Sequence, residues 1–262
     1  MAGLRAYLPP QSSLHPGAAI IGPGSVLSLP PGESAHLVRS LRARPGEPIE
    51  VFDGIGRLWR GTVQTPDPRA LSVNVQASEL VQARHPRLVL AQAIPKGGLM
   101  DDIVRAAVEL DAAEIHPICA ARCEVRLDPP RAAARHERWL SIAIEACKQS
   151  GNPHLPHISP PTPLKTWLAT ETASGAPPAL RLIGSLEPDA RPLASLDTSP
   201  ALRAAERLLL LIGPEGDLAP DEHALARSLG FLPIRFGNNV LRVPTAAHYA
   251  LAALDQLRQR LP

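Results

Sequence analysis

Two glycine-containing loops near the carboxyl end of the chain have the residue types of a ligand site. The first covers residues 213–217 (GPEGD), and the second covers residues 236–242 (FGNNVLR). An apolar run at residues 208–212 (LLLLI) enters the first loop and has the length of a strand that is buried on both faces of a parallel sheet. Ligands of open α/β sheets bind at the carboxyl ends of such strands. Gly213 and Gly216 therefore mark places where backbone approaches a ligand closely, and we expect the two loops to form one pocket.

The spacing of these glycines does not identify the ligand. A P-loop is disfavoured because no Lys-Ser or Lys-Thr pair follows the glycines. A dinucleotide fold is disfavoured because Gly54-Ile55-Gly56 lacks the third glycine and the long following helix. Turn glycines in an ordinary α/β domain remain an alternative. Glu215 is interpreted as a carboxylate that orients its loop by accepting backbone hydrogen bonds, in preference to a catalytic base.

The elements on either side of the loops are predicted to position them. A helix is expected to begin at Pro220, because proline has its φ preset for the first turn and the acidic residues that follow favour the positive end of the helix dipole. Gly230 is expected to end that helix. A strand over residues 232–236 then leads into the second loop, and leucines at helical spacing predict a last helix from Pro244 onward.

The amino-terminal part of the chain is rich in β-forming residues. Short alternating segments at residues 49–52, 58–63 and 71–75 are separated by proline and glycine turns, which is typical of a small β-barrel. We therefore predict two domains, one at residues 1–80 and one at residues 81–262.

The second domain is predicted to open on a core strand and to continue through helices. Residues 88–93 are the strand, and residues 100–110 and 137–149 are the helices. The proline-rich stretches at 153–163 and, apart from one short strand, at 173–200 are predicted to be connectors.

Composition excludes several classes of function. The chain has 262 residues, enough for two domains with a sizeable core, and its formal net charge is only +2. This charge argues against a protein that coats polyanions, although a local basic face is allowed. Aromatic residues make up 3% of the chain, which argues against a stacking surface for single-stranded RNA. Recognition of a base would therefore depend on a pocket.

The apolar runs indicate the cellular compartment, and the cysteines indicate whether a metal site is expected. No apolar run approaches about 18 residues and no signal-like segment opens the chain, so a cytoplasmic protein without a membrane segment is expected. His116, Cys119 and Cys123 lack a fourth ligand at suitable spacing, and Cys147 lies in a helix-like segment. We interpret the three cysteines as structural thiols and predict no metal.

Further segments follow one another in a recognisable order. They are residues 36–42 (HLVRSLR) with Gly46 and 51–54 (VFDG), then 95–101 (PKGGLMD), 109–110, 138–139 and 144–151 (IEACKQSG), and finally 212–216, Leu241-Arg242 and Thr245-Ala246. With these segments, the chain resembles the SPOUT methyltransferases over nearly its whole length. Within them it resembles the RsmE family, the 16S ribosomal RNA (uracil-N3)-methyltransferases.

This resemblance implies a fold, a cofactor and partners. The fold would be α/β, with a trefoil-knotted parallel-sheet SPOUT domain at residues 81–262 preceded by a PUA-like β-barrel RNA-binding domain at residues 1–80. The cofactor would be S-adenosyl-L-methionine. The partners would be 16S ribosomal RNA or the small ribosomal subunit, and a second copy of the chain in a homodimer formed through the knotted domain.

The resemblance also carries cofactor-binding positions onto three segments of the chain. Backbone donors and acceptors in such loops suit a zwitterionic ligand that carries a sulfonium. These positions are Ile183, Gly184, Ser185, Leu186, Ile212, Gly213, Pro214, Glu215, Gly216, Phe236, Gly237, Asn238, Val240, Leu241, Thr245 and Ala246.

Methyl transfer to a uridine sets the demands on the catalytic residues. In-line displacement requires positioning, which contributes roughly 7–11 kcal/mol when it is well achieved. Uracil N3 must also lose a proton, so a cation beside the base would stabilise the developing anion. The resemblance makes Arg242, Lys96 and Gln149 the catalytic candidates. For Arg242 the alternative is a salt bridge that braces the loop.

Candidates for RNA binding are arginines. They are Arg39 and Arg42 in the first domain and Arg122 in the second. For the first two, the alternative is that they are solvated arginines on the surface of a small barrel.

Six positions differ from the family pattern. Asn152 and Asn239 stand in place of arginines, and the other differences are Pro244, Ala106, Ala121 and Asp217, in place of glutamate, lysine, glutamate and glycine. Asparagine does not replace the charge of arginine. Two alternatives to the uridine methyltransferase therefore stay open: a catalytically silent RNA-binding or ribosome-assembly factor on the same fold, and a methyltransferase of a different RNA.

Overall fold

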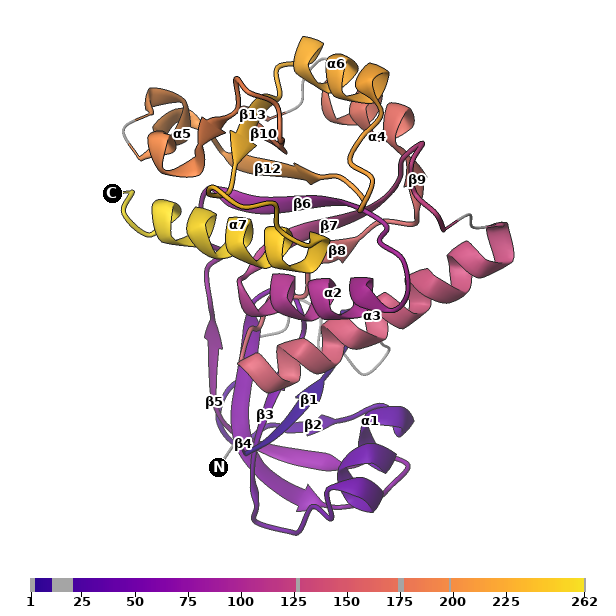
Figure 1. Ribbon diagram of the computed structural model, residues 1–262. Coiled ribbons are helices and arrows are strands. Elements are labelled where there is room, and N and C mark those ends of the chain that lie inside the picture. Colours follow the sequence, from indigo (N-terminus) through magenta and orange to yellow (C-terminus); the bar gives the residue numbers. More distant parts are fainter. Residues whose placement is uncertain (1–2, 11–20, 126–127, 174–176, 198, 262) are drawn as a thin grey trace. The chain divides into compact units, whose positions relative to one another are not determined.

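The computed structural model divides into two compact units (Figure 1). The first comprises Met1–Ala83 and Ile144–Leu155, and the second comprises Arg84–Ala143 and Pro156–Pro262. The residues that the structure describes are 3–10, 21–125, 128–173, 177–197 and 199–261.

The first unit is a five-stranded sheet with one short helical segment. The strand order is β1-β3-β4-β5-β2, and only the β1–β3 pair is parallel. The core contains the fully buried Trp59, Val51 and Leu37. The β-rich character predicted for this part of the chain is confirmed. The elements are β1 (Leu4–Tyr7), β2 (Val26–Ser28), α1 (Pro31–Ala35), the π-helical η1 (His36–Ser40), β3 (Pro48–Phe52), β4 (Arg57–Thr65) and β5 (Ser72–Leu80).

A segment far along the chain completes the first unit. Within residues 144–155, the Lys148 ammonium lies 2.6 Å from a carboxylate oxygen of Glu33, and the carbonyl of Cys147 accepts a hydrogen bond from Arg5. The Leu155 N–H donates to the carbonyl of Gly54 at 2.9 Å. Side-chain and backbone bonds thus join this segment to residues that precede it by 101 to 142 positions, a pairing that local sequence pattern does not reveal.

The second unit is a parallel sheet. Its strand order is β11-β13-β10-β12-β6-β7-β8, β9 also pairs with β7, and every pairing in it is parallel. The elements are β6 (Arg87–Ala93), α2 (Leu99–Glu109), β7 (Ala112–Cys119), α3 (Pro129–Ser150), β8 (His157–Ile158), β9 (Thr162–Pro163), α4 (Leu164–Glu171), β10 (Ala179–Gly184), β11 (Arg191–Pro192), the 3-10 helix η2 (Leu193–Leu196), α5 (Pro200–Ala204), β12 (Arg207–Ile212), α6 (Pro220–Ser228), β13 (Leu232–Arg235) and α7 (Val243–Arg258). The last turns of α3 belong to the first unit.

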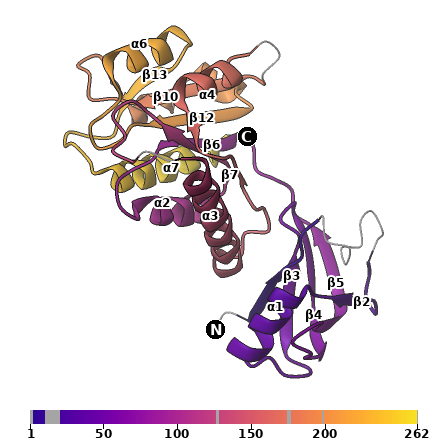
Figure 2. The same ribbon diagram turned by 90° about the vertical axis from the view of Figure 1, so that its right-hand side faces the viewer.

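Helices cover both faces of this sheet. In Figures 1 and 2, α4 and α6 lie over one face and α2 and α7 lie over the other. Leu209 and Leu211 of β12 pack in one core cluster with Trp167 of α4 and with Phe231. Leu208 and Leu210, which alternate with them, are also fully buried. Burial on both faces explains why β12 is a continuous apolar run, as predicted.

The predicted elements around the two loops are confirmed, and two predictions need correction. The α3 helix begins at Pro129, earlier than the expected residue 137, because its first turns carry no apolar periodicity. The stretches predicted as connectors contain the short strands β8, β9 and β11, the helix η2, and Pro200, which begins α5. Two-residue strands depend on pairing with a neighbour, so their own composition does not show them.

In the ranges that the structure describes, none of the helices combines the length and apolarity that crossing a bilayer requires.

Candidate functional site

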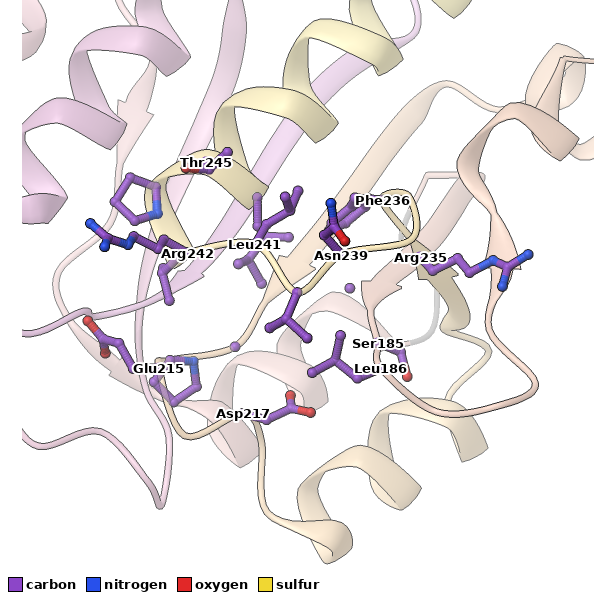
Figure 3. A pocket seen from close by; sticks show the side chains of 18 of the residues that line it. Ser185, Leu186, Glu215, Asp217, Arg235, Phe236, Asn239, Leu241, Arg242 and Thr245 are labelled. Atoms are coloured by element: carbon purple, nitrogen blue, oxygen red, sulfur yellow. The ribbon is translucent and has the colours of Figure 1, made fainter.

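A pocket of about 640 Å³ lies at the carboxyl ends of three strands of the second unit (Figure 3). Its wall is formed by the residues that follow β10, β12 and β13, by the first turn of α7, and by Lys96 and Leu99 after β6. Much of the lining is apolar, including Leu186, Ile212 and Leu241. The two glycine loops therefore form one pocket, as the sequence predicts.

Glycine is required where the strand β10 ends. A Cβ atom added to Gly184 would lie 2.9 Å from the ring of Phe236 and 3.1 Å from the side chain of Ile212. Such distances are too short for ordinary packing, so Gly184 lets the three loops approach one another. The cavity is thus bounded by backbone at this point, and backbone groups are available to a ligand.

Carboxylates hold the loops of neighbouring strands together. Glu215 Oε1 accepts a hydrogen bond at 3.1 Å from the N–H of Lys96, in the loop after β6. The buried Glu222 accepts one from the N–H of Ala121 at 2.8 Å and another from that of Ala219 at 3.0 Å. Glu215 therefore orients a loop as expected. It lies in the loop after β12, but the loop that it orients is the one after β6.

The loop after β10 has its own internal support. The hydroxyl of Ser185 accepts a hydrogen bond from the N–H of Glu187 at 3.1 Å. The same hydroxyl lies 3.1 Å from Nε2 of His223, a largely buried residue of α6. These bonds fix the start of the loop while the side chain of Leu186, at the mouth of the pocket, is 63% exposed.

Three cations and two carboxylates line the pocket. The cations are Lys96, Arg235 and Arg242, and the carboxylates are Glu215 and Asp217. Lys96 also lies 3.6 Å from the exposed Glu124. Arg242 precedes the first turn of α7, and its carbonyl accepts the N–H of Ala246 at 2.8 Å. Among the described residues the Arg242 guanidinium has no ion-pair partner, so the alternative of a bracing salt bridge has no support within them.

Most of the predicted cofactor positions line this pocket. Gly184, Ser185 and Leu186 do so, as do ten further positions. Three do not: Ile183 is fully buried in β10, and Gly216 and Asn238 are absent from the lining. The ten further positions are Ile212, Gly213, Pro214, Glu215, Phe236, Gly237, Val240, Leu241, Thr245 and Ala246.

The other candidates lie at different places. Arg242 and Lys96 line the pocket, whereas Gln149 does not and lies in the last turn of α3, in the segment that belongs to the first unit. Arg39 and Arg42 are exposed on the first unit. Arg122 donates a hydrogen bond to the carbonyl of Gly216 at 2.9 Å, so it contacts the first glycine loop directly.

Six lining residues were not among the predicted site positions. Three of them, Asp217, Asn239 and Pro244, had been identified only as departures from the family pattern, and Val243 follows the predicted Arg242 in sequence. Arg235 carries no local signal, because the last residue of a strand is placed by the sheet. The six are Leu99, Asp217, Arg235, Asn239, Val243 and Pro244.

A second polar cluster is buried in the second unit, near the amino ends of the strands. Arg207 lies 2.9 Å from Glu171 and 3.2 Å from Glu114, and Nε2 of His116 lies 3.3 Å from the same Glu114 oxygen. The hydrogen bond with His116, together with the charge of Arg207 and against the effect of burial, lowers the pKa of Glu114. Glu114, His116 and Glu171 have a spacing that would suit a metal, but Arg207 pairs with both carboxylates and makes the cluster an ion-pair network.

Comparison with known proteins agrees with this architecture. The family model of an RNA methyltransferase domain matches residues 83–255, and that of an RNA methyltransferase PUA domain matches residues 29–76. The chain is 30% identical over 239 residues to ribosomal RNA small subunit methyltransferase E of Mycobacterium bovis, covering 90% of this chain and 88% of the relative. It is also 30% identical to the enzyme of that name from Synechocystis over 233 residues, covering 89% and 74%.

A solved structure shows the same likeness in three dimensions. The crystal structure of a ribosomal RNA small subunit methyltransferase E from Neisseria gonorrhoeae, bound to S-adenosyl methionine, superposes with a TM-score of 0.81. Identity is 28%, and the match covers 97% of this chain and 98% of that one.

Fold and site together define an α/β RNA methyltransferase with a PUA-like domain, which confirms the predicted SPOUT-type architecture. The chain belongs to the ribosomal RNA small subunit methyltransferase E family.

Proposed function

We propose that this chain transfers the methyl group of S-adenosyl-L-methionine to N3 of a uridine in 16S ribosomal RNA. The observation that carries this proposal is the pocket built by the loops after β10, β12 and β13, in a chain of this family. The names of the relatives and the bound ligand of the gonococcal structure support the class of substrate and the cofactor.

The residues present fit this cofactor. A volume of about 640 Å³ lies in the range of small-molecule pockets, and a mostly apolar lining with a few polar groups suits an adenosine. Gly184 and Gly213 allow main-chain donors and acceptors to approach closely, since a Cβ at Gly213 would lie 3.2 Å from a carboxylate oxygen of Asp217. The proposed cofactor-binding residues are those of the predicted positions that line the pocket.

Two cations of the pocket are proposed to stabilise negative charge during the reaction. When bound, the cofactor supplies an electrophilic methyl group on a sulfonium. Arg242 and Lys96 are exposed at the pocket and would stabilise the negative charge that develops on the uracil as N3 loses its proton. Gln149 is proposed as a further contact to the reacting base on the resemblance alone.

The two domains are proposed to divide the work. Residues 1–80 would bind RNA through exposed arginines, including Arg39 and Arg42, and residues 81–262 would bind the cofactor and carry out the transfer. Arg122 is proposed as a further RNA contact, because it is exposed and its guanidinium donates a hydrogen bond to the carbonyl of Gly216 in the first glycine loop.

Three further properties are proposed on family membership. They are a trefoil knot in the second domain, a homodimer formed through that domain, and action in the cytoplasm on the small ribosomal subunit. The exposed Tyr249 of α7, beside a shallow groove that contains Leu193 and Leu257, supports a protein partner on this helix.

Nucleoside mapping of 16S ribosomal RNA tests the proposal. RNA from cells that lack the gene is expected to lose one 3-methyluridine, and expression of the intact chain is expected to restore it. Expression of the Arg242→Ala variant serves as the matched control and should not restore it. An unchanged nucleoside profile would contradict the assigned activity.

Two alternatives have specific support in the chain. Asn152 and Asn239 replace arginines of the family pattern, which favours either a silent RNA-binding factor or a different RNA target. Calorimetry with S-adenosylmethionine distinguishes the silent factor from a methyltransferase, because the silent factor is expected to show no binding at millimolar ligand. Loss of a different methylated nucleoside in the mapping experiment would identify another RNA as the substrate.

A further inference from the structure

Asp217 is a pocket residue whose carboxylate is held by its own loop. It ends the first glycine loop, and its φ of 59° is in the left-handed region that glycine favours. Its N–H donates to the carbonyl of Pro214 at 2.9 Å, and its Oδ1 accepts from the N–H of Leu218 at 2.7 Å. Aspartate tolerates this conformation better than most residues, and these two bonds hold its carboxylate in one place.

The carboxylate of Asp217 differs from that of Glu215 in what it contacts. Glu215 is engaged with the backbone of Lys96. Asp217 has no ion pair with any residue in the described part of the chain, and Oδ1 is bound only to backbone. It lines the pocket together with Ile212 and the exposed Leu186 (Figure 3). A carboxylate beside an apolar wall is stabilised most by a cationic ligand.

We infer that Asp217 makes this pocket selective for the positively charged methyl donor over the neutral thioether product. The inference rests on the proposed function. S-adenosylmethionine and S-adenosylhomocysteine share the adenosine, the ammonium and the carboxylate. They differ in the methyl group and in the positive charge of the sulfonium, because the electron pair of the broken S–C bond stays on sulfur. A fixed negative charge in the wall attracts the first ligand more than the second.

The substitution Asp217→Asn isolates this charge. Asparagine has nearly the same shape, tolerates a positive φ, and retains an oxygen that accepts the Leu218 N–H. The negative charge is removed, and an NH2 group takes the place of the second oxygen. We expect the Kd of S-adenosylmethionine to rise about fivefold or more, and that of S-adenosylhomocysteine to change less than about twofold. The ratio of the two affinities falls accordingly.

Titration calorimetry at low and high salt measures this ratio directly. The ligands are S-adenosylmethionine, S-adenosylhomocysteine and sinefungin, in which a carbon that bears an ammonium replaces the sulfonium. Sinefungin is expected to lose affinity along with the methyl donor. The preference of the wild-type protein for the cationic ligands should shrink as salt rises. Asp221→Asn is the matched control, because Asp221 is exposed, pairs with Lys165 and does not line the pocket.

Asp217→Gly is the second variant, in case the asparagine variant does not fold. Glycine removes the charge and relieves the left-handed backbone, so the same fall in the affinity ratio is expected. Equal losses for both natural ligands, or no loss for either, would overturn the inference. Failure of the wild-type protein to bind either ligand would instead overturn the proposed function, so the two failures are distinguishable.

Discussion

At the scale of single residues, the pocket depends on main-chain shape more than on charged side chains. Gly184 lies against Phe236, and Gly213 lies against Asp217, in places where a larger residue would displace its neighbour. The charged residues, by contrast, are exposed at the pocket or engaged with another loop. Cofactor affinity and methyl transfer should therefore respond to different substitutions.

Arg242→Ala tests the charge at the pocket. Under the proposed function, we expect turnover on 16S ribosomal RNA to fall by about a hundredfold or more, because an anion developing on the uracil would lose a nearby cation. The Kd of S-adenosylmethionine should change by less than about threefold, since the loops keep their backbone. Single-turnover kinetics and calorimetry measure the two quantities. Arg242→Lys retains the charge and should recover part of the rate; unchanged kinetics in the alanine variant would remove Arg242 from the site.

Gly184→Ala tests the shape of the pocket. The added Cβ would meet the Phe236 ring at 2.9 Å, so the ring must shift. We expect cofactor affinity to fall several-fold and the free energy of unfolding to fall by about 1–3 kcal/mol. Calorimetry and urea denaturation are the measurements. Gly98→Ala is the control, because a Cβ there meets nothing within 4 Å and its φ is −95°; equal behaviour of the two variants would count against the close approach.

At the scale of elements, the buried carboxylate of Glu222 connects two loops at one edge of the parallel sheet. Glu222 is in the first turn of α6, where a carboxylate is favoured by the helix dipole, and it is only 4% exposed. Its two oxygens accept backbone hydrogen bonds from Ala121 and Ala219. The loop after β7 is thereby held to the loop that leads into α6.

Glu222→Gln should loosen this connection. A glutamine has one acceptor oxygen, so one of the two N–H groups loses its partner, and the free energy of unfolding should fall by about 1–3 kcal/mol. Urea denaturation measures the loss. The neighbouring Asp221→Asn provides the control, since Asp221 is exposed and should cost less than about 0.5 kcal/mol. A glutamine variant as stable as the control would show that the two bonds contribute little.

At the scale of the whole molecule, charges are buried where strands and helices meet. The network of Glu114, His116, Glu171 and Arg207 connects β7, α4 and β12. Removing one member leaves its partner buried without a counter-charge. The resulting loss of stability is larger than the stability that the ion pair itself contributes. The network is therefore sensitive to protonation.

Acid should weaken the fold through Glu114. Its pKa in the folded chain is lowered from the ordinary 4.5, mainly by the hydrogen bond with His116. A lowered folded-state pKa contributes stability that is present above the unfolded value and is lost as the pH falls through the folded value. We expect the free energy of unfolding to decrease below about pH 4.5, and to decrease less steeply in Glu114→Gln. Urea denaturation between pH 3 and pH 6 measures both slopes, and parallel slopes would exclude this contribution.

Local pattern was sufficient for the elements that carry the pocket. The run at β12, the proline at the start of α6 and the apolar spacing of α7 each predict an element, because burial on one or both faces imposes a periodicity that the residues must follow. Gly213 signals close approach for a similar reason, because only glycine lacks a Cβ. The same prediction for Gly216 is wrong, since Gly216 does not line the pocket and a Cβ there would lie 3.6 Å from the Arg122 side chain, an ordinary contact.

Tertiary structure alone decided which residues meet. Residues 144–155 join the first unit through Lys148 and Arg5, Arg122 donates to Gly216, and Asp217 turns its carboxylate to the pocket wall. These contacts join residues up to 142 positions apart, and no local periodicity encodes such a partner. The sequence by itself thus determined the strands and loops that form the pocket and the resemblance to the family, whereas the two-residue strands, the charge pairs and the place of Asp217 in the pocket arose from packing in three dimensions.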